Sequence, residues 1–503
     1  MKYAAKNIAW GYIGSIATAI MGFVLKQVFI AHLDATLLGV NGLYTGILSL
    51  LNMAELGIGT ALNFSLYAPV ARGDTQKIKS YMQMYRKAYY AIALVVAGIG
   101  LALVPFLRVF IKKPGNNTLR DLTLYYFIFL FNTVSSYFVA YKYSLVNAEQ
   151  KNYIQTNINT ATKIVSEALQ IAVLIFTENF YCYLLADCVV QLIQKFWVNS
   201  YLNRRYPYLT EKDVVPLSKE ESGEVWKKTG ALVWHKIGDV ARLQTDSLII
   251  SSFIEVTVVG VVDNYNLVIS TVSSFVNTIF NSVISGFGNL IATESKQKQY
   301  DMFCIYRFFA CWIYGFSAVA FYILLTPLVR LWLGDAWILS AASVNLILLD
   351  YYFKGERVVL SNYKTAAGVF EPDKYLAVIQ GAVNLVLSIW LVLKIGLPGV
   401  YIGTVISGLI ANVTKPIIIY HVCFDQKSWH YFLDSAKHLA YSALMLVLME
   451  AAGRRVLTHL SLGSFLGMAL LITAAYNAGF VLLFGRTKEF RYLRGMIAGR
   501  FGK

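Results

Sequence analysis

The chain has 503 residues, of which 57% are hydrophobic and only 14% are charged, and its mean hydropathy is +0.55. A soluble domain is usually about one-quarter charged, so this sequence cannot surround a globule of its size with a charged shell. Its 34 Tyr and 30 Phe residues and its five Cys residues also exclude a disordered chain and a disulfide-rich secreted one, which leaves a polytopic membrane protein.

Apolar segments follow one another along the whole chain, and each is long enough to cross the hydrocarbon core, which takes roughly 20 helical residues. We therefore predict an all-α polytopic membrane protein with about fourteen transmembrane helices. The first segment contains Lys26 and precedes no small-residue cleavage pattern, so we interpret it as a retained helix. The segments are 8–31, 37–68, 88–107, 122–146, 153–176, 179–203, 230–254, 258–292, 304–329, 338–362, 375–395, 398–422, 434–453 and 463–485.

Basic residues indicate the orientation, because short cytoplasmic loops are enriched in Lys and Arg. If the N-terminus lies inside, most of the 44 Lys and Arg residues fall on the inner side, and both termini are cytoplasmic. The loop 108–121 is the exception, since it places four basic residues outside. Either these residues rest on lipid headgroups or the span count is locally wrong.

One long polar stretch, 204–229, follows the sixth span near the middle of the chain. We interpret it as a cytoplasmic linker between two lobes. The predicted organisation is a six-helix lobe at 1–203, the linker at 204–229, a second six-helix lobe at 230–430, and two additional transmembrane helices with a basic cytoplasmic tail at 431–503.

Two short patterns recur at nearly the same spacing and indicate an internal repeat. G-V-x-x-x-Y opens the second span at 39–44 and the eighth span at 260–265. E-x-x-x-Y follows the fourth span at 149–153 and the tenth at 371–375. Because six spans separate the copies, both halves face the same way, as in a parallel repeat about an axis along the membrane normal.

Ionisable residues inside the spans carry the functional prediction, because each costs about 2.5–3.5 kcal/mol on insertion scales and therefore faces a cavity or a partner. In the seventh span Asp239, Arg242 and Asp246 share one helical face. Two further pairs, Lys163 with Glu167 and Asp350 with Lys354, are open to both readings, ion pairing alone or a solvated cavity. Asp187 and Lys195, in the sixth span, are more simply explained by pairing or snorkelling.

A cavity with fixed cations suits an anionic ligand, since Arg binds phosphate bidentately and Lys acts as a point charge. The predicted substrate-binding residues are Lys26, Lys236, Arg242, Lys354 and Arg357. A cavity carboxylate can also exchange a proton or a sodium ion for substrate. The ion-coupling candidates are Glu55, Asp246 and Asp263.

The sequence resembles a family at two places. The segment E-L-G-I-G-T-A at 55–61 and the segment T-D-S-L-I-I-S at 245–251, followed by G-V-V-D-N-Y at 260–265, are similar to segments of bacterial polysaccharide flippases that export O-antigen and capsule units. These belong to the multidrug/oligosaccharidyl-lipid/polysaccharide (MOP) exporter superfamily. The resemblance implies two six-helix lobes around a basic cavity, alternating access, and a plasma-membrane protein that translocates undecaprenyl-pyrophosphate-linked oligosaccharides. It also implies association with a polysaccharide polymerase and glycosyltransferases.

Other functions stay open at this point. A cation or multidrug antiporter of the same superfamily usually has twelve spans and an acidic cavity. A lipid II flippase is less favoured, because its family has several arginines in the first bundle, where this chain has only Lys26 and Glu55 in the first two spans. A membrane enzyme needs a positioned nucleophile or acid–base pair, and none of the six His residues forms one. A purely structural protein is also less favoured, because its many charges inside the membrane would be costly to insert and would serve no function.

No cofactor, metal or nucleic acid is expected. The five cysteines lie in or beside apolar segments and form no C-x-x-C pair, so they are interpreted as small buried apolar residues: Cys182, Cys188, Cys304, Cys311 and Cys423.

Overall fold

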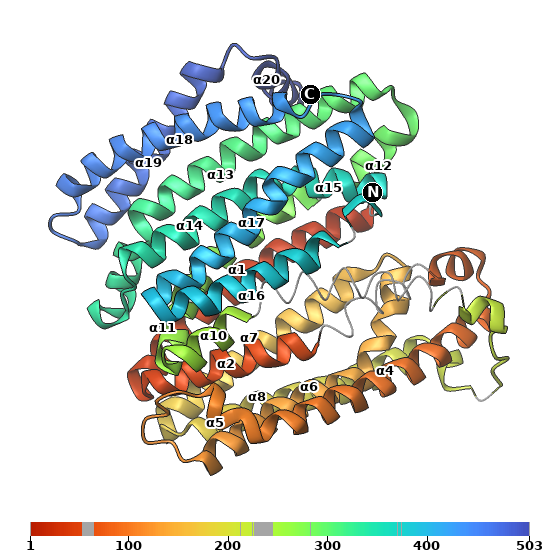
Figure 1. Ribbon diagram of the computed structural model, residues 1–503. Coiled ribbons are helices and arrows are strands. Elements are labelled where there is room, and N and C mark those ends of the chain that lie inside the picture. The colour runs from red at the N-terminus through yellow and green to blue at the C-terminus, as the bar shows by residue number, and fades with distance from the viewer. Residues whose placement is uncertain are drawn as a thin grey trace. The chain divides into compact units, whose positions relative to one another are not determined.

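The computed structural model describes residues 2–52, 65–211, 213–223, 225, 245–281, 283–369, 371–373 and 375–501. These residues form helices and no strand, and ten of their helices are long and apolar enough to cross a membrane. The predicted all-α polytopic fold is confirmed (Figure 1). All fourteen predicted segments overlap helical residues in the described part of the chain. The chain divides into two compact units, 1–263 with 377–382 and 264–376 with 383–503.

Unit 1 is a bundle in which α1 packs on α7, α7 on α8, and α6 on both α4 and α8. The long helices α4, α6 and α8 run side by side in Figure 1. Its elements are α1 (Lys2–His32), α2 (Ala35–Leu51), α4 (Thr75–Leu103), the short α5 (Leu107–Phe110), α6 (Leu119–Ala148), α7 (Asn152–Thr177), α8 (Phe180–Arg205) and α10 (Thr245–Phe253).

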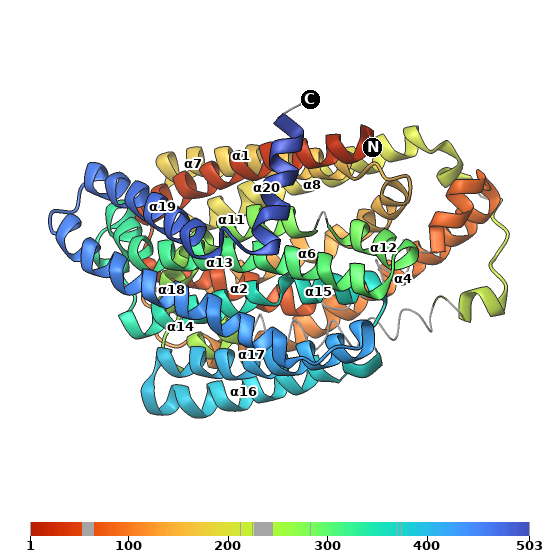
Figure 2. The ribbon, with the colours of Figure 1, turned by 90° about the horizontal axis from the view of Figure 1, so that it is seen from above.

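Unit 2 is organised around α13 (Lys296–Leu333), which packs on α14, α18 and α19 (Figure 2). The last two predicted spans are α18 (Trp429–Val456) and α19 (Leu462–Phe484), and aromatic side chains join them to α13 in one buried cluster. The other elements are α12 (Ile284–Thr293), α14 (Ala341–Glu356), α15 (Val358–Ala367), α16 (Leu376–Ile395), α17 (Leu397–Ile419) and α20 (Lys488–Phe501), while α11 (Val256–Asn281) begins in unit 1 and continues into unit 2.

Polar side chains define where several helices begin, and they move one boundary away from its prediction. The Asp74 carboxylate accepts a hydrogen bond from the Lys77 backbone N–H and so caps α4. The helix therefore starts thirteen residues before the predicted span 88–107, because its basic first turns continue beyond the apolar run. Thr118 and Asp121 form a reciprocal capping box at the start of α6.

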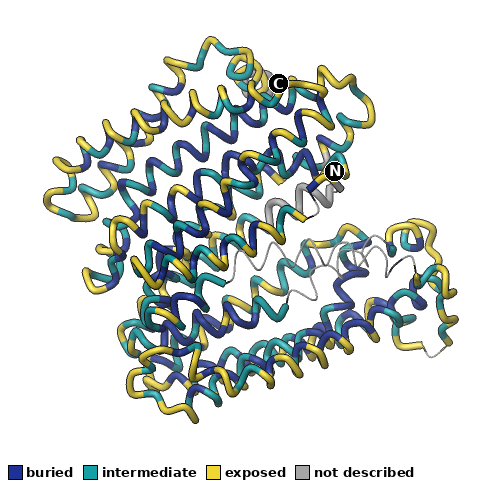
Figure 3. Tube along the Cα trace, viewed as in Figure 1, coloured by how far each residue is buried: buried dark blue, intermediate teal, exposed yellow. Residues whose placement is uncertain are grey.

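Exposed residues run along the helix surfaces in Figure 3, and many of them are large and apolar. Leu94 on α4 is 75% exposed, and Leu482 on α19 is 84% exposed. In water such faces would be costly, but hydrocarbon surrounds them in a membrane-spanning bundle. The protein is therefore a multi-pass membrane protein.

Two lysines of the basic loop 108–121 contact residues at the junction of α10 and α11. The Lys112 ammonium donates to the Phe253 carbonyl oxygen at 3.0 Å, and the Lys113 ammonium pairs with Glu255 at 2.7 Å. Both acceptors lie just beyond or at the C-terminus of α10, where helix carbonyls favour cations. Two of the loop's four basic residues thus hold the junction of α10 and α11 against this loop.

The two copies of G-V-x-x-x-Y meet in unit 1. A Cβ added to Gly39 would lie 1.9 Å from the Val256 carbonyl oxygen, and one added to Gly260 would lie 2.9 Å from the Gly39 nitrogen. Only glycine permits this approach of α2 to the first turn of α11. The repeated motif is therefore a packing contact between its own copies.

The tyrosines of the two copies have equivalent roles. The Tyr44 hydroxyl donates to the Leu122 carbonyl oxygen in the first turn of α6 at 2.8 Å. The Tyr265 hydroxyl accepts from the Leu339 backbone N–H, just before α14, at 3.2 Å. Both rings are fully buried. The second pattern is less symmetric, because Tyr153 packs on a buried cluster whereas Tyr375 is 68% exposed.

Candidate functional site

Lys26 on α1 and Asp263 on α11 form the first part of the site, in unit 1. Both residues are half-buried, and their opposite charges act on each other. The Asp263 carboxylate lies against Gly42 of α2, where an added Cβ would come within 1.9 Å of Oδ2. From the sequence we assigned Lys26 to substrate binding and Asp263 to ion coupling. In the structure the two charges interact, next to the contact between α2 and α11.

A polar cavity of about 630 Å³ lies within unit 1, between α1, α2, α6, α7 and α8. We call it the polar cavity. Amide and hydroxyl side chains make up most of its polar lining, and Phe129 and Tyr183 add aromatic surface. Its amide and hydroxyl residues are Asn41, Thr45, Asn132, Asn159, Thr162, Ser166, Gln170, Gln191 and Gln194.

Charged residues of the polar cavity form a connected network. The Lys163 ammonium lies 3.8 Å from Glu167 Oε1, so the predicted pair exists and also lines a cavity. Glu167 Oε2 is buried, and no described residue donates a hydrogen bond to it. A buried carboxylate oxygen without a donor is costly, so this side of the cavity is suited to a cation, a proton or a ligand hydroxyl.

Asp187 and Lys195, on α8, are joined through α6. Ser166 Oγ donates to Asp187 Oδ1 at 2.5 Å, and Asn132 Nδ2 donates to Oδ2 at 3.3 Å. The Lys195 ammonium donates to the Asn132 backbone and side-chain oxygens at 2.7 and 2.6 Å, and to Ser135 Oγ at 2.8 Å. Asn132 therefore bridges an acid and a base, so pairing is indirect and neither group needs to snorkel to the membrane surface.

The predicted cations of unit 2 have protein partners. Arg357 is 6% exposed, and its Nη1 donates to the Gly408 carbonyl oxygen and to Asn412 Oδ1, both at 2.6 Å. The Lys354 ammonium lies 2.5 Å from Asp350 Oδ2, while its side chain is 40% exposed. Arg357 thus links α14 to α17, and Lys354 keeps one accessible side.

The remaining predicted residues are placed only in part. Asp246 is half-buried in the first turn of α10. Glu55, Lys236 and Arg242 lie outside the described residues, as do Asp239 and the motif at 55–61.

Sequence reasoning did not single out two cations that the structure buries. Arg307 of α13 is 4% exposed, stacks on the Tyr431 ring at 3.7 Å, and donates to the Tyr431 carbonyl oxygen at 2.8 Å. Lys142 of α6 is 5% exposed. The signal was available, because both residues fall inside the apolar ranges 304–329 and 122–146. In the described part of the chain, no cluster of His, Cys, Asp and Glu side chains could hold a metal ion.

Solved structures with the same fold are transporters and flippases. A structure titled lipid II flippase MurJ, inward closed conformation, has a TM-score of 0.68 at 14% identity, covering 94% of this chain and 98% of that one. An inward-facing MATE-family multidrug resistance transporter of the MOP superfamily has a TM-score of 0.63 at 14% identity, over 79% of this chain and 92% of the other. A mutant of the Vibrio cholerae MATE transporter VcmN has a TM-score of 0.57 at 13% identity, over 86% of this chain and 100% of the other.

The chain has the fold of MOP-superfamily transporters. Its sequence matches no protein-family model and no curated protein. Since these identities are far below 25%, the likeness establishes the fold, and the substrate must be argued from the site.

Proposed function

We propose that this protein is a flippase that translocates undecaprenyl-pyrophosphate-linked oligosaccharides across a bacterial plasma membrane by alternating access. The polar cavity is the observation that carries the proposal. Oligosaccharides present many hydroxyl groups that both donate and accept hydrogen bonds, and amide side chains offer both functions in return. A cavity lined by nine Asn, Gln, Ser and Thr side chains, with two aromatic rings, therefore suits a sugar better than an apolar drug.

Cations inside the membrane serve the pyrophosphate in this proposal. Lys26 is the best placed among the described residues, because it is half-buried in unit 1 beside Asp263. Lys236, Arg242, Lys354 and Arg357 complete the proposed set, with Arg357 acting mainly through its hold on α17. Asp246, Asp263 and Glu55 are the proposed sites for a coupling proton or sodium ion.

A cation-coupled multidrug antiporter is the second candidate. Glu167 and Asp187 favour it, because two acidic side chains in one membrane cavity suit a cation. The two candidates differ in what the amide groups bind: the flippase uses them for sugar hydroxyls, whereas the antiporter leaves them without a specific partner.

Binding of a sugar-bearing lipid tests the proposal. Purified protein in nanodiscs is titrated with undecaprenyl pyrophosphate carrying an oligosaccharide and, separately, with sugar-free undecaprenyl pyrophosphate. We expect the sugar to tighten binding about tenfold, and Asn159→Leu, in the polar cavity, to remove that difference. Asn157→Leu, on the same helix and outside the cavity lining, is the matched control. Equal binding of both lipids, together with saturable binding of a lipophilic cation, favours the antiporter.

A further inference from the structure

A second cavity, of about 520 Å³, lies in unit 1 and belongs to neither the polar cavity nor the predicted site. It is formed where the first turns of α4 meet the last turns of α6 and α8, together with residues 208–211 and Val214. Three cations line it, Lys79 and Arg86 from α4 and Lys142 from α6, against one carboxylate among its lining residues, Glu211. We call it the basic cavity.

Lys142 is the buried cation of this cavity, and hydrogen bonds fix the position of its ammonium group. Only 5% of the residue remains exposed, and its ammonium donates to Oδ1 of Asn199 and Oδ1 of Asn203, both at 2.5 Å. Both acceptors are neutral amides on one face of α8, four residues apart. A buried ammonium normally requires an opposite charge, because desolvation costs several kcal/mol per ion. Lys142 is therefore held in place with its charge uncompensated by the described protein.

Arg86 adds a second uncompensated charge. It is exposed, it lines the cavity, and its positive charge acts on Lys142 and on Tyr141. No described carboxylate forms an ion pair with Arg86 or Lys142. Glu211 is already paired with Lys79 at 2.9 Å. Two like charges thus face the same space, an arrangement that an anion stabilises.

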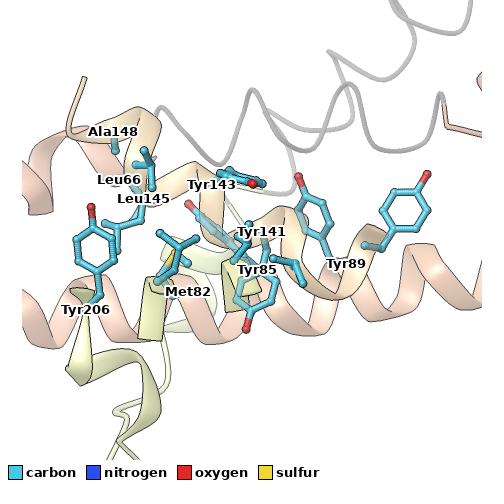
Figure 4. Close-up of a cluster of buried hydrophobic side chains, with 14 of the residues drawn as sticks. Leu66, Met82, Tyr85, Tyr89, Tyr141, Tyr143, Leu145, Ala148 and Tyr206 are labelled. Atoms are coloured by element: carbon cyan, nitrogen blue, oxygen red, sulfur yellow. The ribbon is translucent and has the colours of Figure 1, made fainter. Parts of the chain in front are cut away.

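Aromatic residues border the cavity and connect it to the outer face of the bundle. Tyr90 and Phe138 line it and are 41% and 47% exposed, with ring centroids 5.2 Å apart. Figure 4 shows the buried cluster beside the cavity, in which the labelled Met82, Tyr85 and Tyr141 lie close together. A cationic interior with an apolar aromatic rim is suited to a ligand with a charged head and a hydrocarbon tail.

We propose that the basic cavity binds the phosphate or pyrophosphate headgroup of a membrane lipid. The cations coordinate the phosphoryl oxygens, and the rim formed by Tyr90 and Phe138 contacts the start of the tail. The same chemistry would also hold a free phosphate, so the test must separate the two sources. The inference is independent of oligosaccharide transport, because the basic cavity shares no lining residue with the polar cavity.

The test uses Arg86→Gln, which removes a surface charge that makes no ion pair with the described residues and so leaves folding intact. Lys87→Gln is the matched control: it removes the same charge from the adjacent exposed position of α4, outside the cavity. Purified full-length protein is titrated with inorganic pyrophosphate by calorimetry. We expect saturable binding that weakens about tenfold in Arg86→Gln, is largely restored in Arg86→Lys, and is unchanged in Lys87→Gln.

Native mass spectrometry then identifies the source, with undecaprenyl phosphate and zwitterionic phosphatidylcholine as probes. Retention of undecaprenyl phosphate by the wild type and by Lys87→Gln, with loss in Arg86→Gln and displacement by pyrophosphate, supports the lipid-headgroup site. Pyrophosphate binding without retention of undecaprenyl phosphate overturns the lipid assignment in favour of a soluble anion. Equal binding in Arg86→Gln and Lys87→Gln overturns the site itself. A protein that passes these tests but moves no oligosaccharide contradicts the proposed function and leaves this site in place.

Discussion

Gly39 and Gly260 allow α2 and α11 to pack in close contact, because neither residue has a Cβ. A Cβ on Gly39 would meet the Val256 backbone four residues before Gly260, and a Cβ on Gly260 would meet the Gly39 backbone. The sequence marked both positions through the pattern G-V-x-x-x-Y, but it could not say that the copies touch. Periodicity identifies which helices are equivalent, whereas contact between them depends on how the bundle closes.

Gly39→Ala is expected to destabilise the protein. The added methyl group would lie 1.9 Å from the Val256 carbonyl oxygen, a backbone atom that cannot rotate away. Overpacking of this kind costs roughly 1–3 kcal/mol, so the apparent Tm in detergent should fall by several degrees. Gly98→Ala is the control, because its Cβ would meet nothing within 4 Å. A Tm for Gly39→Ala equal to that of Gly98→Ala would contradict the close contact.

Tyr44→Phe and Tyr265→Phe should have matching effects, since each removes one buried hydrogen bond at the start of an equivalent helix. The expected loss is about 1 kcal/mol for each change. Thermal unfolding followed by fluorescence measures both against Tyr181→Phe, a change at a residue that is 40% exposed, which should be neutral. A large effect at only one of the two buried positions would argue against the repeat.

For the charged residues of the site, the sequence predicts burial in the bundles but not the partners of the side chains. Insertion cost correctly selects Lys26, Asp263 and Arg357 as buried or half-buried in the bundles. It does not reveal their partners: Lys26 faces an acid from α11, whereas Arg357 binds neutral oxygens of α17. Neutral partners of this kind are invisible to a search for opposite charges. The polar cavity was missed for a related reason, because Asn, Gln, Ser and Thr are common in many helices and carry no spacing rule.

At the scale of elements, the apolar runs predict the helices well and their ends poorly. α4 extends well before its apolar run because an Asp74 cap and a basic amphipathic stretch continue the helix beyond the bilayer. Hydropathy marks where lipid begins, whereas capping and packing decide where a helix begins. In the loop 108–121, Lys112 and Lys113 contact residues at the end of α10 and just after it.

Residues 213–223, in the middle of the polar segment, contact α4 through Glu221. Lys77 donates a hydrogen bond to the Glu221 carboxylate, and the Ser218 backbone N–H donates another, and these hold the pKa of Glu221 below its usual range. A carboxyl with a lowered folded pKa stabilises docking above its ordinary pKa of about 4.3. That contribution is lost as the pH falls through the lowered value.

Hydrogen exchange of residues 213–223 measures this docking. We expect protection at pH 7 and pH 5, loss of protection below about pH 4, and faster exchange at pH 7 in Glu221→Gln than in the wild type. Glu220→Gln, on the neighbouring residue, is the control and should exchange as the wild type does. Because both partners are about one-third exposed, the effect should be small and salt-sensitive.

At the scale of the whole molecule, the proposed transport rests on the chemistry of the cavities together with the fold. The described helices place charged and amide side chains inside an apolar exterior, and the same fold occurs in a lipid II flippase and in MATE transporters. Composition alone predicted the class, because a chain with 14% charged residues cannot surround a globule of its size with a charged shell. The substrate could not be read from sequence, since a cavity that accepts many sugars leaves no short motif.

Lys26→Met tests the proposed role of the intramembrane cation in that transport. Because Lys26 is half-buried beside Asp263, its loss should slow translocation of a pyrophosphate-linked substrate at least tenfold while the protein remains folded. Lys298→Met, which removes an exposed lysine paired with Glu294, should leave the rate unchanged. Equal rates for both variants in proteoliposomes would remove Lys26 from the mechanism.

Movement of the oligosaccharide across the bilayer is the most direct measurement of the central claim. Proteoliposomes containing the purified chain and a fluorescent undecaprenyl-pyrophosphate-linked oligosaccharide are exposed to an impermeant glycosidase, and the protected fraction is followed with time. The account predicts that inner-leaflet substrate becomes cleavable with the wild type and stays protected in protein-free vesicles. Substrate that stays protected with the wild type, while the same vesicles transport a lipophilic cation along an ion gradient, would contradict it.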